Sequence, residues 1–296
     1  MNDKKIPVVI DCDPGADDAL AILLALSSPK LDVVGITTLC GNGPAEQMAK
    51  NAAKVCAMAG RLDIPVYIGS EQPMERRLKF TTLYCGEDGL CESGLREHNE
   101  LISQTGAADF FAGLSGPVTV VATAGLTNLA QVLLRTPKAA EHIREIVFAG
   151  GYFRLNPKPD RAEWNVLVDP EAAQVVFASG IPMRCVGLDV TNCLEDTFVE
   201  QLLHETDGRV HDFVKACTDY DRRVGLSVYS ILVDGMAVAA VMEPETASYV
   251  RGRVQIHPDR KDAGLMEFHP CDDGNVLAAG AFAYDTYLSM MKEMMK

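Results

Sequence analysis

The sequence predicts an α/β fold in which a mostly parallel central sheet is flanked by helices. Short apolar runs rich in β-branched residues alternate with longer segments of helical periodicity, and this alternation is typical of parallel strands joined by helical crossovers. Several of the expected strands end in polar loops. With 296 residues, 48% of them hydrophobic and 23% charged, the chain has enough apolar side chains to bury a large core.

The expected elements follow one another regularly through the first two thirds of the chain. Strands are expected at 8–10, 31–38, 66–68, 118–122, 146–149 and 183–188. Helices are expected between them at 17–28, 44–60, 104–113, 127–134 and 169–179. Segments 70–103 and 152–162 lack periodicity and are expected to be long loops, which in α/β domains often contribute to binding sites.

Composition limits the partners and the compartment. The net charge of −14, from 27 basic and 41 acidic residues, argues against a nucleic-acid partner or an anionic membrane surface. No apolar stretch reaches the roughly 18 residues of a membrane-spanning helix, and the amino terminus leaves no room for the apolar core of a signal peptide. The nine cysteines form no Cys-x-x-Cys pair and are expected to be reduced thiols. We therefore expect a cytoplasmic protein.

A dense acidic loop follows the first expected strand. Residues 11–18 read Asp-Cys-Asp-Pro-Gly-Ala-Asp-Asp and come directly after the apolar run 6–10. Four carboxylates this close repel one another unless a cation or protons compensate them, and the carboxyl end of a strand is where α/β sheets place ligands. The last two acids could simply cap the next helix, but this alternative leaves Asp11 and Asp13 unexplained. Ligands that are all oxygen favour Ca²⁺ or Mg²⁺ over zinc.

The motif from Asp11 to Ala19 resembles the amino-terminal motif of the nucleoside hydrolases, the inosine-uridine-preferring family. Further blocks occur in the family's order: Gly41-Asn42, 124–130, Gly150-Gly151, 163–165, 168–173, 189–191 and 234–239. The resemblance implies a Rossmann-like nucleoside hydrolase fold, with residues 1–296 as one domain, assembled as a homodimer or homotetramer. It also implies hydrolysis of the N-glycosidic bond of ribonucleosides to ribose and free nucleobase, in nucleoside salvage or catabolism.

The same resemblance implies a Ca²⁺ site and a ribose site. The ion would be bound by the carboxylates of Asp13, Asp18 and Asp234 and by a backbone carbonyl, that of Thr127. Asp13 would also activate a metal-bound water as the nucleophile. Taken alone, Asp234 could be only the cap of the helical run that follows it. The ribose would be hydrogen-bonded by Asp17, Asn42, Asn156, Glu163 and Asn165, and Asp11 would support the site from a second layer.

The residues around the nucleobase depart from the family pattern. Members that cleave both purine and pyrimidine nucleosides carry a histidine immediately before the last metal-binding aspartate, where this chain has Val233. A second family histidine, in a His-Gly-x-x-Gly-Leu loop, corresponds to Cys85. None of the six histidines falls in a recognised motif, and His98 is the candidate substitute acid. The residues expected to line the base pocket are Tyr84, Cys85, Trp164, Tyr229 and Val233.

Two alternative functions stay open at this stage. Asp11-x-Asp13 after the first strand also resembles the nucleophile and acid of haloacid-dehalogenase-like Mg²⁺ phosphohydrolases, and 271–275 resembles their Mg²⁺ motif. The Pro-Gly-x-Asp-Asp continuation does not fit that family. The second alternative is a non-catalytic ribose- or nucleoside-binding protein that keeps the metal site. Assays for released ribose and released phosphate would separate these functions.

Overall fold

A nine-stranded sheet runs through the computed structural model, which describes residues 4–78, 84–156, 162–259, 261 and 263–296. The strand order is β3-β2-β1-β4-β5-β6-β9-β7-β8. All neighbours from β3 to β9 pair in parallel, and β7 pairs antiparallel with β9 and β8, so the mostly parallel sheet is confirmed. The strands are β1 (Ile6–Cys12), β2 (Leu31–Thr38), β3 (Val66–Ile68), β4 (Val118–Ala122), β5 (Ile143–Ala149), β6 (Met183–Val186), β7 (Ala247–His257), β8 (Leu265–Pro270) and β9 (Val276–Phe282).

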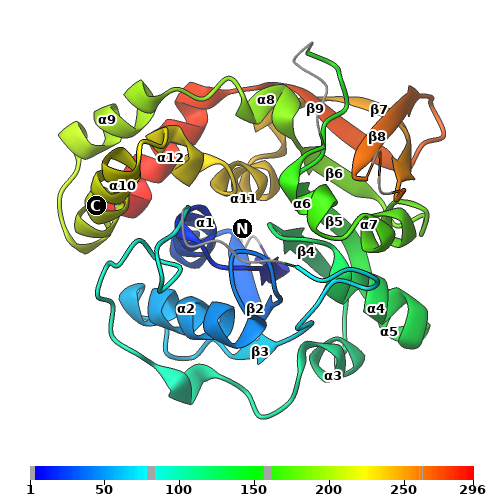
Figure 1. Ribbon diagram of the computed structural model, residues 1–296, viewed down its shortest axis with the longest axis horizontal. Coiled ribbons are helices and arrows are strands. Elements are labelled where there is room, and N and C mark those ends of the chain that lie inside the picture. Colours follow the sequence, from blue (N-terminus) through cyan, green and yellow to red (C-terminus); the bar gives the residue numbers. More distant parts are fainter. Residues whose placement is uncertain (1–3, 79–83, 157–161, 260, 262) are drawn as a thin grey trace.

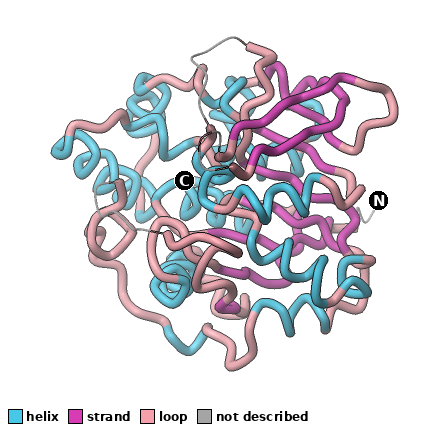
Figure 2. The backbone as a smooth tube through the Cα atoms, turned by 45° about the vertical axis from the view of Figure 1, so that its right-hand side comes forward, coloured by secondary structure: helices cyan, strands magenta, loops and turns pink. Residues whose placement is uncertain are grey.

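Helices cover both faces of the sheet (Figures 1 and 2). They are α1 (Ala16–Ser27), α2 (Ala45–Met58), α3 (Ala107–Ala112), α4 (Thr127–Arg135), α5 (Pro137–Ala140), α6 (Trp164–Val168), α7 (Pro170–Phe177), α8 (Leu188–Thr191), α9 (Asp196–Glu205), α10 (Arg209–Val224), α11 (Gly235–Met242) and α12 (Tyr284–Met295), with 3₁₀ turns η1 (Asn99–Leu101), η2 (Val228–Leu232) and η3 (Pro244–Thr246). In the described part of the chain, no helix combines the length and the apolar character needed to cross a bilayer.

Two hydrophobic clusters hold the layers together. One packs α1, α2 and α9 to α12 against one face of the sheet, and the other packs α3, α4 and α7 against the opposite face. Along β1, Val8 and Ile10 belong to the first cluster and Val9 to the second. Because both faces of the strand are buried, its sequence is continuously apolar instead of alternating.

Every element expected before residue 188 is present, with small differences at the ends. The expected helix 104–113 is shorter, as α3, and the expected strand 183–188 stops at Val186 because α8 begins at Leu188. Beyond residue 188 only the helical run in α11 was recognised, and α9, α10, α12 and β7 to β9 were not. Within the two expected loops, residues 79–83 and 157–161 lie outside the described residues.

The topology places the acidic loop at a switch in strand order. The chain adds β2 and β3 on one side of β1 and then returns to add β4 on the other side. In register, Asp11 at the end of β1 lies opposite Thr37 of β2 and Ala122 of β4. The loops that leave these three parallel strands therefore meet at one edge of the sheet, which is the usual ligand site of such folds.

Candidate functional site

A small acidic cavity, of about 120 Å³, lies at this edge of the sheet. None of its described lining residues is a lysine, arginine or histidine. Its polar lining consists of the carboxylates Asp13, Asp17, Asp18, Glu163 and Asp234, the amides Asn42 and Asn165, and the hydroxyl residues Thr123 and Thr191. The fold thus brings together most of the residues that the sequence predicted for metal and sugar, from segments more than 200 residues apart.

Three carboxylates form the tightest group in the cavity. One oxygen each of Asp17, Asp18 and Asp234 lies within 4.8 Å of the others. The Oδ1 atom of Asp18 accepts a hydrogen bond from the Thr123 hydroxyl at 2.6 Å, and its Oδ2 accepts one from the backbone N–H of Gly15 at 3.1 Å. Asp18 therefore also caps α1. Asp234 precedes α11 but makes no capping hydrogen bond, so capping does not explain its position.

Asp13 faces the same cavity from the loop between β1 and α1. Its Oδ2 accepts the backbone N–H of Asn42 at 2.6 Å, and its backbone oxygen accepts the Asn42 side-chain amide at 3.0 Å. A Cβ atom on Gly41 would lie 1.8 Å from the Asp13 carboxylate, so only glycine permits this approach. The loop after β2 thereby fixes the Asp13 side chain.

Burial and mutual repulsion raise the free energy that is needed to ionise these carboxyl groups. Burial and the neighbouring Asp18 raise the pKa of Asp13 well above its usual value, and burial and Asp17 raise the pKa of Asp18 to about 8. The pKa of Asp234 is also raised well above its usual value, by burial and then by Asp17. A buried group of carboxylate oxygens without a cationic side chain in its lining fits a hard divalent cation, which would compensate these charges.

Glu163 and Asn165 are held rigidly on the opposite wall. Glu163 caps α6: its Oε1 accepts the N–H of Asn165 and its Oε2 accepts the N–H of Gly151, both at 2.9 Å. The Asn165 side-chain amide donates to the carbonyls of Thr123 and Ala149, again at 2.9 Å. These bonds tie the ends of β4 and β5 to the start of α6 and fix the orientation of both polar side chains.

Asp11, predicted to support the site, lines neither cavity. It is fully buried, and its Oδ1 accepts hydrogen bonds from the Thr37 hydroxyl at 2.6 Å and the Asn128 amide at 2.8 Å. Asn128 in turn accepts the backbone N–H of Ser70 at 2.8 Å. Asp11 thus connects β1 to β2 and α4 underneath the acidic loop.

Thr127, Asn156 and Tyr229, which were predicted for the metal, the sugar and the base respectively, line neither the acidic cavity nor its apolar neighbour. Thr127 is buried in the first turn of α4 and its hydroxyl donates to Asp169 at 2.7 Å. Thr123, which directly follows β4, lines the cavity instead. The Asn156 amide donates to two backbone carbonyls away from the lining, and Tyr229 packs, half-buried, against the core in η2. The sequence signal that could have identified Thr123 is its position directly after an expected strand.

A larger cavity, of about 300 Å³ and mostly apolar, adjoins the acidic one and shares Asp17, Asn42 and Trp164 with it. Tyr84 and Trp164 are 55% and 45% exposed, so neither is a core aromatic. The lining comprises Ala16, Asp17, Gly41, Asn42, Tyr84, Cys85, Trp164, Asp221, Leu226, Ser230 and Ile231, whereas Val233 lines the acidic cavity. Asp221 was not predicted.

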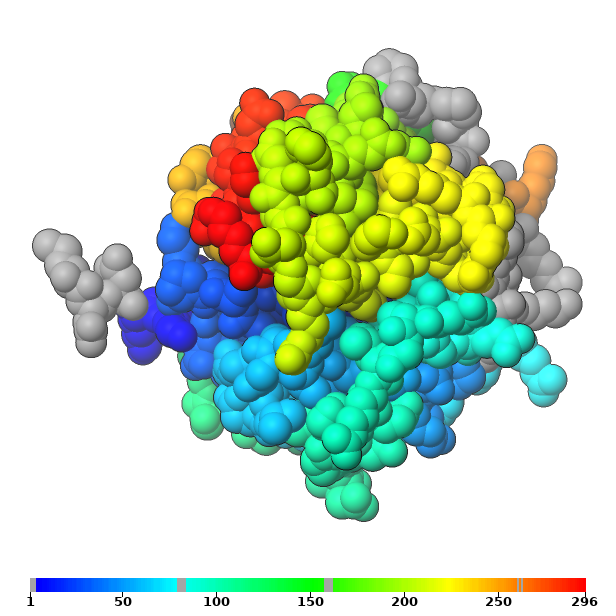
Figure 3. Space-filling model, turned by 90° about the vertical axis from the view of Figure 1, so that its left-hand side faces the viewer, coloured from blue at the N-terminus to red at the C-terminus, as the bar shows by residue number. Residues whose placement is uncertain are grey.

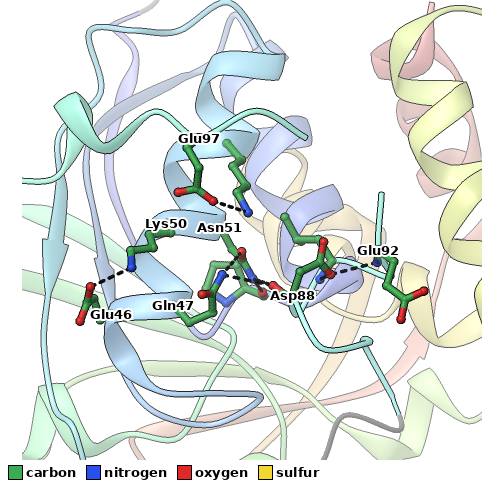
Figure 4. Close-up of polar contacts among 10 residues, drawn as sticks. Glu46, Gln47, Lys50, Asn51, Asp88, Glu92 and Glu97 are labelled. Carbon is green, nitrogen blue, oxygen red and sulfur yellow. Dashed lines mark hydrogen bonds and ion pairs between the residues drawn. The ribbon is translucent and has the colours of Figure 1, made fainter. Parts of the chain in front are cut away.

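The buried side-chain amide of Asn51 joins the acidic loop to another segment that contributes to the apolar cavity (Figure 4). The Nδ2 atom of Asn51 in α2 donates to the carbonyl of Asp88 at 3.0 Å and to that of Pro14 at 3.1 Å, while its Oδ1 accepts from Gln47 at 3.0 Å. Pro14 belongs to the acidic loop, and Asp88 to the segment 84–98, which lies at the surface between α2 and α10 (Figure 3). Asn51 therefore ties together two segments that supply lining residues, Asp13 from the first and Tyr84 and Cys85 from the second.

Replacing Asn51 with leucine is expected to lower the free energy of unfolding by about 2 to 3 kcal/mol, because two buried carbonyls lose their donor. KM should rise more than kcat falls, since the wall of the apolar cavity loosens. Urea unfolding and steady-state kinetics measure both effects. The matched control is Lys50→Met, which removes the neighbouring half-exposed ion pair with Glu46 and is expected to leave the free energy of unfolding nearly unchanged. Equal effects of the two variants would contradict the role of Asn51.

The geometry is inconsistent with the phosphohydrolase alternative. Asp11, which would be the nucleophile, lines neither cavity. The segment 271–275 lies in the turn before β9, at the amino-terminal edge of that strand and therefore away from the carboxyl edge that carries the acidic loop. Its Asp273 forms an exposed ion pair with Arg253. The two halves of the expected Mg²⁺ motif are thus on opposite edges of the sheet.

Comparison with known proteins agrees with the fold. The family model of inosine-uridine preferring nucleoside hydrolases matches residues 8–283. Pyrimidine-specific ribonucleoside hydrolase RihA of Escherichia coli O1:K1 is 41% identical over 191 residues, so the match spans 63% of this chain and only 61% of that relative. A plant nucleoside hydrolase structure is 29% identical, covers 99% of both chains and superimposes with a TM-score of 0.87. A purine-preferring ribonucleoside hydrolase from Gardnerella vaginalis, 24% identical with 98% of both chains covered and a TM-score of 0.86, has the same fold. Because the family model spans most of the chain, this protein belongs to the inosine-uridine preferring nucleoside hydrolase family.

Proposed function

We propose that this protein is a Ca²⁺-dependent ribonucleoside hydrolase, which uses water to cleave the N-glycosidic bond and releases ribose and free nucleobase. The observation that carries the proposal is the pair of adjoining cavities, one small and acidic and one larger and mostly apolar. Carboxylates and amides suit the hydroxyls of ribose, and an apolar cavity with exposed aromatic rings at its lining suits a flat base. The relatives named above are nucleoside or ribonucleoside hydrolases, which supports the same reaction.

The ion would be held by Asp13, Asp18 and Asp234, with one oxygen from Thr123. Thr123 replaces Thr127 in this proposal because it reaches the acidic cavity. Bound Ca²⁺ would supply positive charge that acidifies the attacking water and orients the 2′- and 3′-hydroxyls. Donors that are all oxygen match the preference of Ca²⁺.

The protein's own residues would orient the sugar and accept the proton. Asp13, fixed by Asn42, takes the proton from the water that attacks the anomeric carbon. Asp17, Glu163 and Asn165 hydrogen-bond the ribose. As the C–N bond breaks, positive charge develops on the sugar, and the surrounding carboxylates stabilise this oxocarbenium-like transition state more than the ground state.

The test is ribose release from a panel of purine and pyrimidine ribonucleosides. The panel is needed because the relatives include a pyrimidine-specific and a purine-preferring enzyme. Activity should disappear on chelation and return with Ca²⁺. If no nucleoside yields ribose in the presence of Ca²⁺ while calorimetry detects nucleoside binding, the protein is the non-catalytic binder considered above.

2′-Deoxyribonucleosides are expected to be poor substrates. The proposed sugar site offers buried polar groups to each hydroxyl, and removal of one hydroxyl leaves such groups unpaired. We therefore expect kcat/KM for 2′-deoxyuridine to be at least about 100-fold below that for uridine. Side-by-side assays at one enzyme concentration measure this ratio, and equal turnover would contradict the assignment of the acidic cavity to the ribose.

Two predictions from the family resemblance accompany the proposed activity. The protein is expected to form a homodimer or homotetramer and to be cytoplasmic. Light scattering coupled to size-exclusion chromatography tests the first, and cell fractionation tests the second. A monomeric mass at micromolar concentration would contradict the expected assembly.

A further inference from the structure

A buried acid in the apolar cavity has no role so far. Asp221 lies in α10, is 4% exposed and lines this cavity together with Asp17. Within the described residues, no backbone or side-chain group is recorded as a donor to its carboxylate. The adjacent Arg222 and Arg223 point elsewhere, since they pair with Glu200 and Glu92 respectively. The carboxyl group is therefore available to a molecule in the cavity.

The groups around Asp221 disfavour its ionised form. Asp17 from α1 and Asp196 from α9 are acidic, and Cys91 from the segment 84–98 is a thiol close enough to interact with it. Burial, followed by the charges of Asp17 and Asp196, raises the pKa of Asp221 to about 7. Near neutral pH a substantial fraction of the side chain is thus a carboxylic acid, which can donate a proton.

The other described groups near the cavity are poorer donors. Burial raises the pKa of the Cys85 thiol well above its usual value, and the Tyr84 phenol is more than half exposed. Val233 is apolar. His98 is paired with Glu100 and lines neither cavity. The positions that carry histidine in other family members therefore supply no proton here.

We propose that Asp221 is the catalytic acid that protonates the departing nucleobase, an inference that rests on the proposed hydrolase function. When the bond between C1′ and the base nitrogen breaks, its electron pair stays on the base. The Asp221 carboxyl proton passes to a ring nitrogen or carbonyl oxygen of the base, and the resulting carboxylate later takes a proton from solvent. Water adds to C1′ and gives its proton to Asp13, so nucleoside and water become ribose and neutral base.

The experiment compares two leaving groups in the isosteric variant Asp221→Asn. A natural nucleoside needs its base protonated, whereas p-nitrophenyl β-D-ribofuranoside expels p-nitrophenolate, which leaves without a proton. The variant should lose about 100-fold or more in kcat on nucleosides and stay within about threefold on the aryl riboside. The matched control Asp219→Asn makes the same change at an exposed position of the same helix, which pairs with Lys215 and lines neither cavity, and should change neither substrate's kcat more than about threefold.

The pH profile of the wild-type protein gives a second readout that needs no variant. Nucleoside hydrolysis should decline as pH rises above about 7, where Asp221 loses its proton, while aryl riboside hydrolysis should show no such decline. Equal losses on both substrates, or no loss on nucleosides, would overturn the role of Asp221 while the hydrolase function stands. A wild-type protein inactive on both substrates would overturn the proposed function and this inference together.

Discussion

Replacing Asp13 with asparagine is expected to lower kcat for nucleoside hydrolysis by about 1000-fold or more. The variant loses the proposed base, and a positioned base alone contributes roughly 100- to 10,000-fold. It also loses one proposed ligand of the ion. The fold should survive, because the amide has the same shape and its oxygen can still accept the Asn42 N–H. Initial rates of ribose release measure the loss of activity, and urea unfolding measures stability.

The matched control for this variant is Asp109→Asn, the same change at an exposed position in α3. Its activity should stay within about twofold of the wild-type value, as is usual for a surface position remote from the site. Asp13→Asn removes a buried charge from a cluster of like charges, so the unfolding midpoint of this variant without Ca²⁺ should not decrease. Activity of Asp13→Asn within tenfold of wild type would contradict the proposed role.

The elements that the sequence predicted, β1 to β6 and the helices that connect them, are those in which the pattern of buried residues is regular along the chain. β1 to β6 are short apolar runs because helices cover both faces of the sheet, and their connecting helices are long and periodic. The missed strand β7 alternates buried and exposed residues and carries Arg251 and Arg253. The missed helix α10 is mostly polar and buries only one stripe. In these elements the inward face becomes evident only after the sheet is assembled.

The site was predictable where its residues are contiguous or belong to recognised blocks. Four acids in one loop indicate a binding site because such closely spaced like charges repel one another. Glu163, Asn165 and Asp234 were found through the family motif. A block does not say which of its residues reaches the cavity: the resemblance implied the backbone carbonyl of Thr127, whereas Thr123 is the residue that lines the cavity.

Asp221 carried no sequence signal, because an aspartate beside two arginines in a polar helix is typical of a solvated face. Asp221 lines the cavity because α10 packs beside the segment 84–98. The ion pair between Arg223 of α10 and Glu92 of that segment joins the two. The role of Asp221 therefore depends on tertiary contacts between segments about 130 residues apart, which local sequence does not encode.

Stabilisation of the protein by Ca²⁺ is expected to increase with pH. Burial and Asp17 raise the pKa of Asp18 to about 8 in the folded protein, whereas the unfolded chain loses this proton near its ordinary value of 3.8. Between these two pH values the unfolded state has fewer protons bound, so the metal-free protein becomes less stable as pH rises. Cation binding requires ionised carboxylates, so its apparent affinity rises over the same window. At about 100 times Kd the gain is about 2.7 kcal/mol, which corresponds to about 5 to 10 °C in Tm.

Thermal unfolding from pH 5 to 8, with either EDTA or Ca²⁺, measures both trends. Asp234→Asn separates the two contributions, because the neutral amide removes the cost of a buried charge and also one proposed ligand. At pH 8 this variant should melt at a higher temperature than wild type in EDTA, and its increment with Ca²⁺ should largely disappear. A Ca²⁺ increment that is the same at pH 5 and pH 8 would contradict the argument, since binding would then not require the buried carboxylates to lose their protons.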